Sequence, residues 1–469
     1  MSLDAVANHA VANHARTVVY IADFFGVLQQ KATGLTQRFA AVERGYFSPA
    51  EENELRGLLV SYWHARSALF ELLVDLGYDA NGRIEYPDQS EPVSRMTFVT
   101  ALAAAVALVD AGRFLREIVD GNPLIRSKLN EPDPSLGIEA GSYDKVQKSL
   151  FKTKHAWHLY HAIQFYEQHA DEIREQTIEP PFTECLSIVD RLWHRFDVSI
   201  SRFTRAKLRS RGARLLRTVA NQFFGRAMYG LQKFGGIIVA DRYVRIGHRP
   251  GLPKEIEDQL IPLLQTGDVL VVRKEFALTT YFLPGYWPHA ALYLGTTKDL
   301  QELGLSSCPQ FSRRWDQIAG VKSEAGSGRN QCVLEGMKDG VCIRPISSPF
   351  GSDSIVALRP CLDKPQIAQA MSRGMAHESK PYDFDFDFRR SDRLVCTEVV
   401  FRSYDGENGL TIPLKQRLGR PTLSGSDMIE LGVAQEIFRP VAVYAPNLLD
   451  EGLIQGDRCV ELLQAGLER

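Results

Sequence analysis

Hydrophobic positions in the first half of the chain recur every three to four residues, which is the period of an α-helix. The segment Ser48-Pro49-Ala50-Glu51 has the pattern of a capping box with proline at the first helical position, and it predicts a helix through LRGLLVSYWHARSALFELLVDLGY. Further helices are predicted near 96–119, 142–175, 183–200 and 202–233. We therefore expect this half to be a helical bundle or array.

The pattern changes near Gly235-Gly236, and beyond GHRPGLP at 247–253 it becomes that of short strands. Strands are predicted at 268–273, 289–295, 331–336, 341–346 and 354–360, with helices near 363–377 and 396–404. The sequence thus indicates an α+β protein with two domains: an α-helical domain at 1–245 and an α+β domain with a small antiparallel sheet at 246–469.

The longest apolar run, Phe98 to Val109, is shorter than the roughly 20 residues that a membrane-spanning helix needs. Asp110 and Arg113 follow it, so we expect a buried helix. The N-terminal residues lack a basic stretch followed by an apolar core, which is not the pattern of a secretory signal. The seven cysteines contain no C-x-x-C pair, so they indicate reduced thiols rather than a disulfide framework. A soluble, cytoplasmic protein is the expectation.

Composition adds few constraints on partners. The chain is 44% hydrophobic and 24% charged with a formal net charge of -2, so no overall attraction to nucleic acid is expected. One segment, RFTRAKLRSRGARLLR at 202–217, carries seven Arg or Lys and no acid. It is either a solvated helix face or a patch for peripheral contact with an anionic membrane or an acidic partner.

Two groups of residues suggest a metal site, but neither has the pattern of one. His155, His158 and His161 are spaced by three, so on a helix they drift around the axis, and no nearby acid or cysteine completes a ligand set. The segment YDFDFDF at 382–388 lacks the glycine and glutamate of a calcium loop, with Phe388 and Leu394 in their places. Its alternation predicts a strand with carboxylates on one face. We expect no metal and no cofactor.

His289 opens the segment HAALYLG, where a hydrophobic residue would serve a strand equally well. A single strand histidine is commonly structural, so only further residues can indicate chemistry. Cys396 in DRLVCTEVVFRSY falls near a predicted helix N-terminus, where free N–H groups favour the nucleophilic thiolate. Glu335, in a hairpin whose turn is Lys338-Asp339-Gly340, could orient a histidine ring; its alternative is an exposed strand carboxylate.

The segments TGDVLVVR, PHAALYLG, VLEGMKDGVCIRP, PYDFDFD and VCTEVV occur in an order that resembles the circularly permuted papain-fold hydrolases of the YaeF/YiiX type, relatives of the NlpC cell-wall peptidases. The resemblance covers about residues 260–445. It implies a papain-like fold with Cys396 as nucleophile, His289 as general base and Glu335 as orienting acid. The family more often has tyrosine before the cysteine and serine after it, where this chain has Val395 and Thr397.

The leading functional hypothesis is a cysteine amidase or peptidase that acts on a small amide or a cell-wall peptide through a thioester. A second hypothesis is an acyl-lipid or thioester hydrolase or acyltransferase, with FALTTYFLPGYW at 276–287 lining an acyl channel. A third is a non-enzymatic helical docking module with a degenerate catalytic domain. For an enzyme, we expect substrate contacts from the aromatic residues Trp287, Tyr293 and Tyr382.

Overall fold

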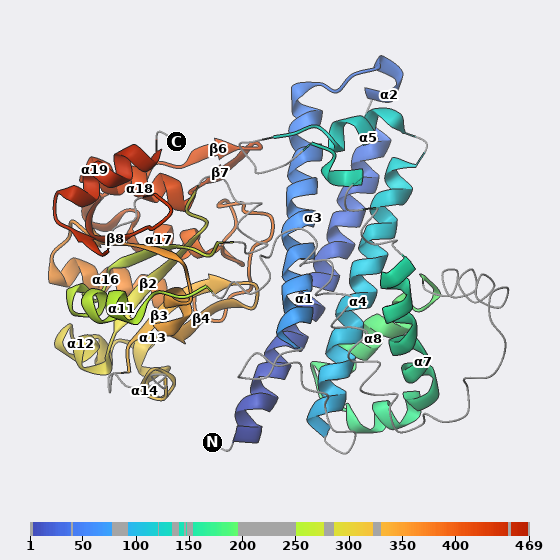
Figure 1. Cartoon of the computed structure of the whole chain (residues 1–469), viewed down its shortest axis with the longest axis horizontal. Helices are drawn as coiled ribbons and strands as arrows, with labels where there is room; N and C mark the ends of the chain where they lie inside the picture. The colour runs from blue at the N-terminus through green and yellow to red at the C-terminus, as the bar shows by residue number, and fades with distance from the viewer. Residues whose placement is uncertain are drawn as a thin grey trace. The chain divides into compact units, whose positions relative to one another are not determined.

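The structure of the chain is a computed structural model, which describes residues 3–38, 41–76, 92–120, 122–133, 140–144, 147, 153–195, 250–275, 286–321, 330–448 and 452–467. The chain forms two compact units, and the boundary between them falls between Ile246 and Gly247 in the sequence. The first unit is built from helices and the second contains the sheet (Figure 1). This arrangement confirms the α+β prediction.

The described part of the first unit is a set of packed helices with α4 at its centre, in contact with α1, α3, α7 and α8 (Figure 1). Their bounds are α1 Leu3–Arg38, α3 Pro49–Asp75, α4 Pro92–Val119, α5 Pro123–Leu129, α7 Thr153–Gln176 and α8 Phe182–Leu192. At the start of α3 the Ser48 N–H donates to Glu51 Oε2 at 2.7 Å. The Glu51 N–H donates back to Ser48 Oγ at 3.4 Å, so the predicted capping box is confirmed.

Helix α4 contains the stretch Arg95–Val119, which is long and apolar enough to cross a membrane by length and composition alone. Within this unit, however, 72% of its most apolar window is buried. The run from Phe98 to Leu108 is almost wholly inaccessible to solvent, which confirms the predicted buried helix. Such burial is typical of a core helix, and the packing of neighbouring helices accounts for its apolar surface on every side.

The second unit is organised by a seven-stranded sheet in the order β4-β3-β2-β1-β5-β8-β9, in which every adjacent pair is antiparallel. The strands are β1 Val269–Arg273, β2 His289–Gly295, β3 Cys332–Met337, β4 Gly340–Pro345, β5 Ser354–Pro360, β8 Phe438–Tyr444 and β9 Ile454–Gln455. A two-stranded ribbon, β6 Lys415–Arg417 with β7 Arg420–Thr422, lies outside the sheet. The first five strands agree with the predicted segments to within one or two residues.

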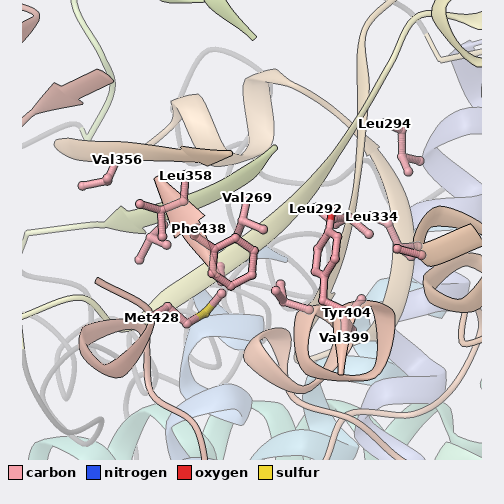
Figure 2. Close-up of a cluster of buried hydrophobic side chains, with 14 of the residues drawn as sticks. Val269, Leu292, Leu294, Leu334, Val356, Leu358, Val399, Tyr404, Met428 and Phe438 are labelled. Atoms are coloured by element: carbon pink, nitrogen blue, oxygen red, sulfur yellow. The ribbon is translucent and has the colours of Figure 1, made fainter. Parts of the chain in front are cut away.

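Helices cover both faces of this sheet because its strands are apolar on both sides. Val269 and Val271 of β1 face one core, and the alternating Leu270 and Val272 face the other. Figure 2 shows the first core, where strand side chains meet Val399 and Tyr404 of helix α17 and residues of helix α18. The helices of this unit are α11 Lys254–Leu260, α12 Thr297–Glu302, α13 Pro309–Ser312, α14 Trp315–Ala319, α15 Ser347–Phe350, α16 Lys364–Met375, α17 Cys396–Tyr404, α18 Gly425–Ala434 and α19 Arg458–Leu467.

The segment 382–388 is not a strand, so that prediction was wrong. The Asp383 carboxylate accepts the N–H groups of Asp385 at 3.1 Å and of Asp387 at 2.8 Å, which bends the chain into a turn. Phe386 takes a positive φ of 52°, which no strand residue adopts. The local hydrogen bonds of Asp383 therefore take the place of the strand hydrogen bonds that the alternating aromatic and acidic residues had predicted. The basic run at 202–217 and most of 276–287 lie outside the described residues.

A buried ion pair ties β1 to β5 at the start of the sheet. The Asp268 carboxylate, 1% exposed, accepts from Arg359 Nε at 2.8 Å and from Nη2 at 2.7 Å. It also accepts the Gln265 N–H at 2.8 Å. Both carboxylate oxygens are thus used, which offsets part of the desolvation of the charge.

Replacing Asp268 by Asn should destabilise the sheet by about 3 kcal/mol, because it leaves the Arg359 guanidinium without its counter-ion at nearly constant shape. The urea dependence of hydrogen exchange, read at peptides covering β1 and β5, measures this loss. Asp258→Asn is the matched control, since the Asp258 pair with Lys254 is exposed and should contribute little. Equal effects of the two substitutions would contradict this account of the ion pair.

Candidate active site

Cys396 is the first residue of α17, and Val395 before it has the extended conformation of an N-cap residue, with φ -88° and ψ 168°. The thiol therefore lies where the first N–H groups of the helix have no partner within the helix. The backbone N–H groups of Ala290 and Thr397 lower its pKa. The residue is 2% exposed, because α17 packs against β2 and β3. The predicted position at a helix N-terminus is confirmed.

His289 is the first residue of β2, and Glu335 lies on the adjacent strand β3. The His289 Nε2 atom is 2.8 Å from Glu335 Oε2. The imidazole is about a quarter exposed, whereas the carboxylate is 1% exposed. Glu335 is therefore not the exposed strand carboxylate that was its alternative. Its buried charge requires a partner, and His289 is one.

Cys396 is the second partner of His289, because each of the two groups shifts the pKa of the other toward its charged form. Glu335 occupies Nε2, so Nδ1 is the ring nitrogen open to the sulfur. Burial opposes the charged form of the Cys396 thiol, but the His289 imidazolium and the two backbone N–H groups outweigh burial and lower the pKa of Cys396. Burial likewise opposes the imidazolium, yet the Cys396 sulfur and Glu335 raise the pKa of His289 to about 10. The arrangement favours a thiolate beside an imidazolium.

Burial would raise the pKa of the Glu335 carboxyl, but His289, Arg344 and Ser348 reverse the direction and lower it. Ser348 Oγ donates to Glu335 Oε1, and Arg344 Nε lies 3.3 Å from the same oxygen. Sequence reasoning missed both residues. Arg344 is near Glu335 only through the register of the β3–β4 hairpin, and Ser348 belongs to the short helix α15 that follows it.

Gly336 allows the helix N-terminus to approach β3. A Cβ at this position would lie 3.2 Å from the Cys396 nitrogen and 3.2 Å from the Val395 carbonyl carbon, closer than nearly all real contacts of that kind. Both atoms belong to the backbone, so they cannot move aside as a flexible side chain could. The glycine next to Glu335 was a signal for this close approach that the sequence reasoning did not use.

The three aromatic residues predicted to contact substrate lie in different surroundings. Trp287 and Tyr293 are each 3% exposed, and they pack in the two separate cores on opposite faces of the sheet. Their burial gives them packing roles, and a substrate contact stays a prediction for both. Tyr382 is half-buried and forms a bridge with Leu394, two residues before Cys396. Tyr382 thus lies beside the segment that leads into Cys396.

The carboxylates of the 383–387 turn hold that turn together and do not take the place of Glu335 at His289. Among the described residues, no group of three or more His, Cys, Asp or Glu side chains is placed to bind a metal ion. The side chains of His155, His158 and His161 lie outside the described part of the chain.

Comparison with known families adds an independent observation. A family model described as permuted papain-like amidase enzyme, YaeF/YiiX, C92 family matches residues 263–445. Over these residues the chain is similar to the permuted papain-like amidases. The match confirms the resemblance found in the sequence, and it supports a cysteine amidase. Searches of curated proteins and of solved structures gave no match.

The order of elements in the second unit places the strand with His289 and the strand with Glu335 before the helix that begins at Cys396. All seven cysteines of the chain are free. Burial raises the pKa of Cys185 and Cys332 to about 12, and of Cys342 and Cys459 to about 11. Cys396 differs from these four because charged and polar partners outweigh its burial.

Gly336→Ala should slow alkylation of Cys396 by iodoacetamide near pH 6 by roughly tenfold to a hundredfold, since the new methyl group displaces the cysteine backbone from His289. Peptide mapping by mass spectrometry measures the rate. Gly251→Ala is the matched control, because a Cβ there meets nothing within 4 Å. An unchanged rate in folded Gly336→Ala would show that the close approach does not position Cys396.

Proposed function

We propose that the permuted papain-like domain is a cysteine hydrolase in which Cys396 is the nucleophile, His289 the general base and Glu335 the acid that orients the histidine. The observation that carries this proposal is that Cys396, at a helix N-terminus, interacts with the His289 ring, whose Nε2 lies 2.8 Å from Glu335 Oε2. A nucleophile, a base and an orienting acid that contact one another in this order form a triad, which activates a thiol for acyl transfer.

In the proposed reaction the Cys396 thiolate attacks the carbonyl carbon of an amide, forming a C–S bond while the carbonyl π electrons move to oxygen. Free N–H groups at the start of α17 stabilise the oxyanion. His289 donates its proton to the amide nitrogen, the C–N bond breaks, and an amine leaves behind a thioester on Cys396. Water then attacks the thioester as His289 takes its proton, and the C–S bond breaks to release a carboxylic acid.

A small amide or a cell-wall peptide is the proposed substrate class, because the matching family is described as an amidase family. Tyr382 is the proposed substrate contact. It is half-buried, and it bridges Leu394, which lies two residues before Cys396. The acyl-lipid alternative rested on 276–287, and residues 276–285 are outside the described part. The family match and the partnered cysteine favour an enzyme over a docking module with a degenerate catalytic domain.

A cytoplasmic location remains part of the proposal. Seven free cysteines, four of them buried in the two units, suit a reducing compartment, where thiols are kept unpaired. Nucleic acid is not a proposed partner. Contact of 202–217 with an anionic membrane or an acidic protein also stays a prediction, since that segment falls outside the described residues.

The nucleophile can be tested without knowledge of the substrate. A free thiol ionises near a pKa of about 8.5, whereas the lowered pKa of Cys396 keeps it a thiolate at lower pH. Because His289 keeps its proton up to a pKa of about 10, the ion pair persists across the neutral range. Cys396 should therefore react with iodoacetamide near pH 6 ahead of the other six cysteines, including the exposed Cys361.

His289→Ala should slow this reaction by about a hundredfold or more, because the thiol loses the cation that stabilises its anion. The reactivity of Cys361 in the same sample is the internal control. If Cys396 in the folded wild-type protein reacts no faster than Cys361, the proposed hydrolase is wrong and the docking-module hypothesis becomes the better one.

A further inference from the structure

The Glu335 carboxylate has partners on both of its oxygens, and only one of them is His289. Oε2 contacts His289 Nε2 at 2.8 Å. Oε1 accepts a hydrogen bond from Ser348 Oγ and lies 3.3 Å from Arg344 Nε in an ion pair. Because the carboxylate is only 1% exposed, water cannot replace these hydrogen-bond and ion-pair partners. The stability of the carboxylate form thus depends on three protein groups.

Ser348 and Arg344 both come from the chain that directly follows Glu335. Arg344 lies on β4, which pairs with β3 through the whole hairpin. Its guanidinium also binds the Asp339 carboxylate in the hairpin turn, so its position is fixed from two sides. Ser348 lies on α15, immediately after β4. The hairpin and the short helix thus place both of these partners at the Glu335 carboxylate.

We propose that Ser348 and Arg344 are positioning residues that hold Glu335 as a carboxylate turned toward the His289 ring. This inference rests on the proposed function, in which His289 must carry a positive charge beside the thiolate. A protonated Glu335 would lack the negative charge that stabilises the imidazolium. Neither residue contacts Cys396 in the described hydrogen bonds, so both act through Glu335.

The charged and titratable groups around Glu335 are His289 of β2, Arg344 and Cys342 of β4, Asp339 of the turn through Arg344, and Cys396 of α17 through His289. With His289 protonated, the two cations of this set balance the two carboxylates. Removing the Ser348 donor or the Arg344 charge destabilises the anion of Glu335. The Glu335 carboxylate is then protonated at a higher pH, and the His289 imidazolium loses its counter-ion there. The acid limb of the Cys396 profile, the low-pH range over which its alkylation rate falls, must then move to higher pH.

The experiment measures the rate of Cys396 alkylation by iodoacetamide as a function of pH in the full-length protein. Ser348→Ala and Arg344→Met should each move the acid limb upward by about one pH unit, because Glu335 loses a hydrogen-bond donor in the first variant and an ion-pair partner in the second. Ser348→Thr keeps the hydroxyl and Arg344→Lys keeps the charge, so both should stay near the wild-type profile. Thermal unfolding of each variant reports whether it is folded.

Two matched controls separate positioning from general disruption. Ser347→Ala removes the neighbouring hydroxyl on α15 and should leave the profile unchanged. Asp339→Asn disturbs the turn but leaves the Arg344 charge to Glu335, so the acid limb should not move upward. A profile in Ser348→Ala that keeps its acid limb, with or without uniform slowing, overturns the inference. A wild-type protein without selective Cys396 reactivity near pH 6 instead overturns the proposed function.

Discussion

The contact between His289 and Glu335 is the interaction on which the rest of the site depends. A carboxylate with 1% exposure is stable as an anion only if the protein provides cations and donors for it. His289, Arg344 and Ser348 meet that need from three different elements. In return, the anion makes an imidazolium favourable in a largely buried position, and that imidazolium lowers the pKa of Cys396. The charge on one buried group thus favours the thiolate form of Cys396, the proposed nucleophile.

The fold supplies this contact by ordinary sheet geometry. Adjacent antiparallel strands bring His289 and Glu335 together, although 46 positions separate them in the sequence. The third residue comes from a helix whose first turn meets the same strands, which Gly336 allows because it has no side chain. Apolar packing of α17 on the sheet, through Val399 and Tyr404, holds that first turn in place (Figure 2). The hydrophobic core therefore sets the geometry of the polar site.

Sequence reasoning predicted the elements where one physical signal acted alone. Strands β2 and β5 and helix α17 have their predicted bounds, because the apolar periodicity of each is clear and buried. The segment 382–388 was mispredicted because the local hydrogen bonds of Asp383 outweigh its alternation. Ser348 and Arg344 could not be found in this way, since their contact with Glu335 depends on hairpin register and on the path of the chain after β4. Periodicity indicates which face a residue occupies, but it does not name its polar partners.

The central claim is that Cys396 carries the acyl group during turnover. The most direct measurement is mass spectrometry of acid-quenched reactions of wild type and Cys396→Ala with a panel of peptides, N-acyl amides and phospholipids. The account predicts cleavage of an amide by the wild type alone, with a transient acyl adduct on the peptide that contains Cys396. Equal cleavage by both proteins, or turnover in which the acyl group is never found on Cys396, would contradict it.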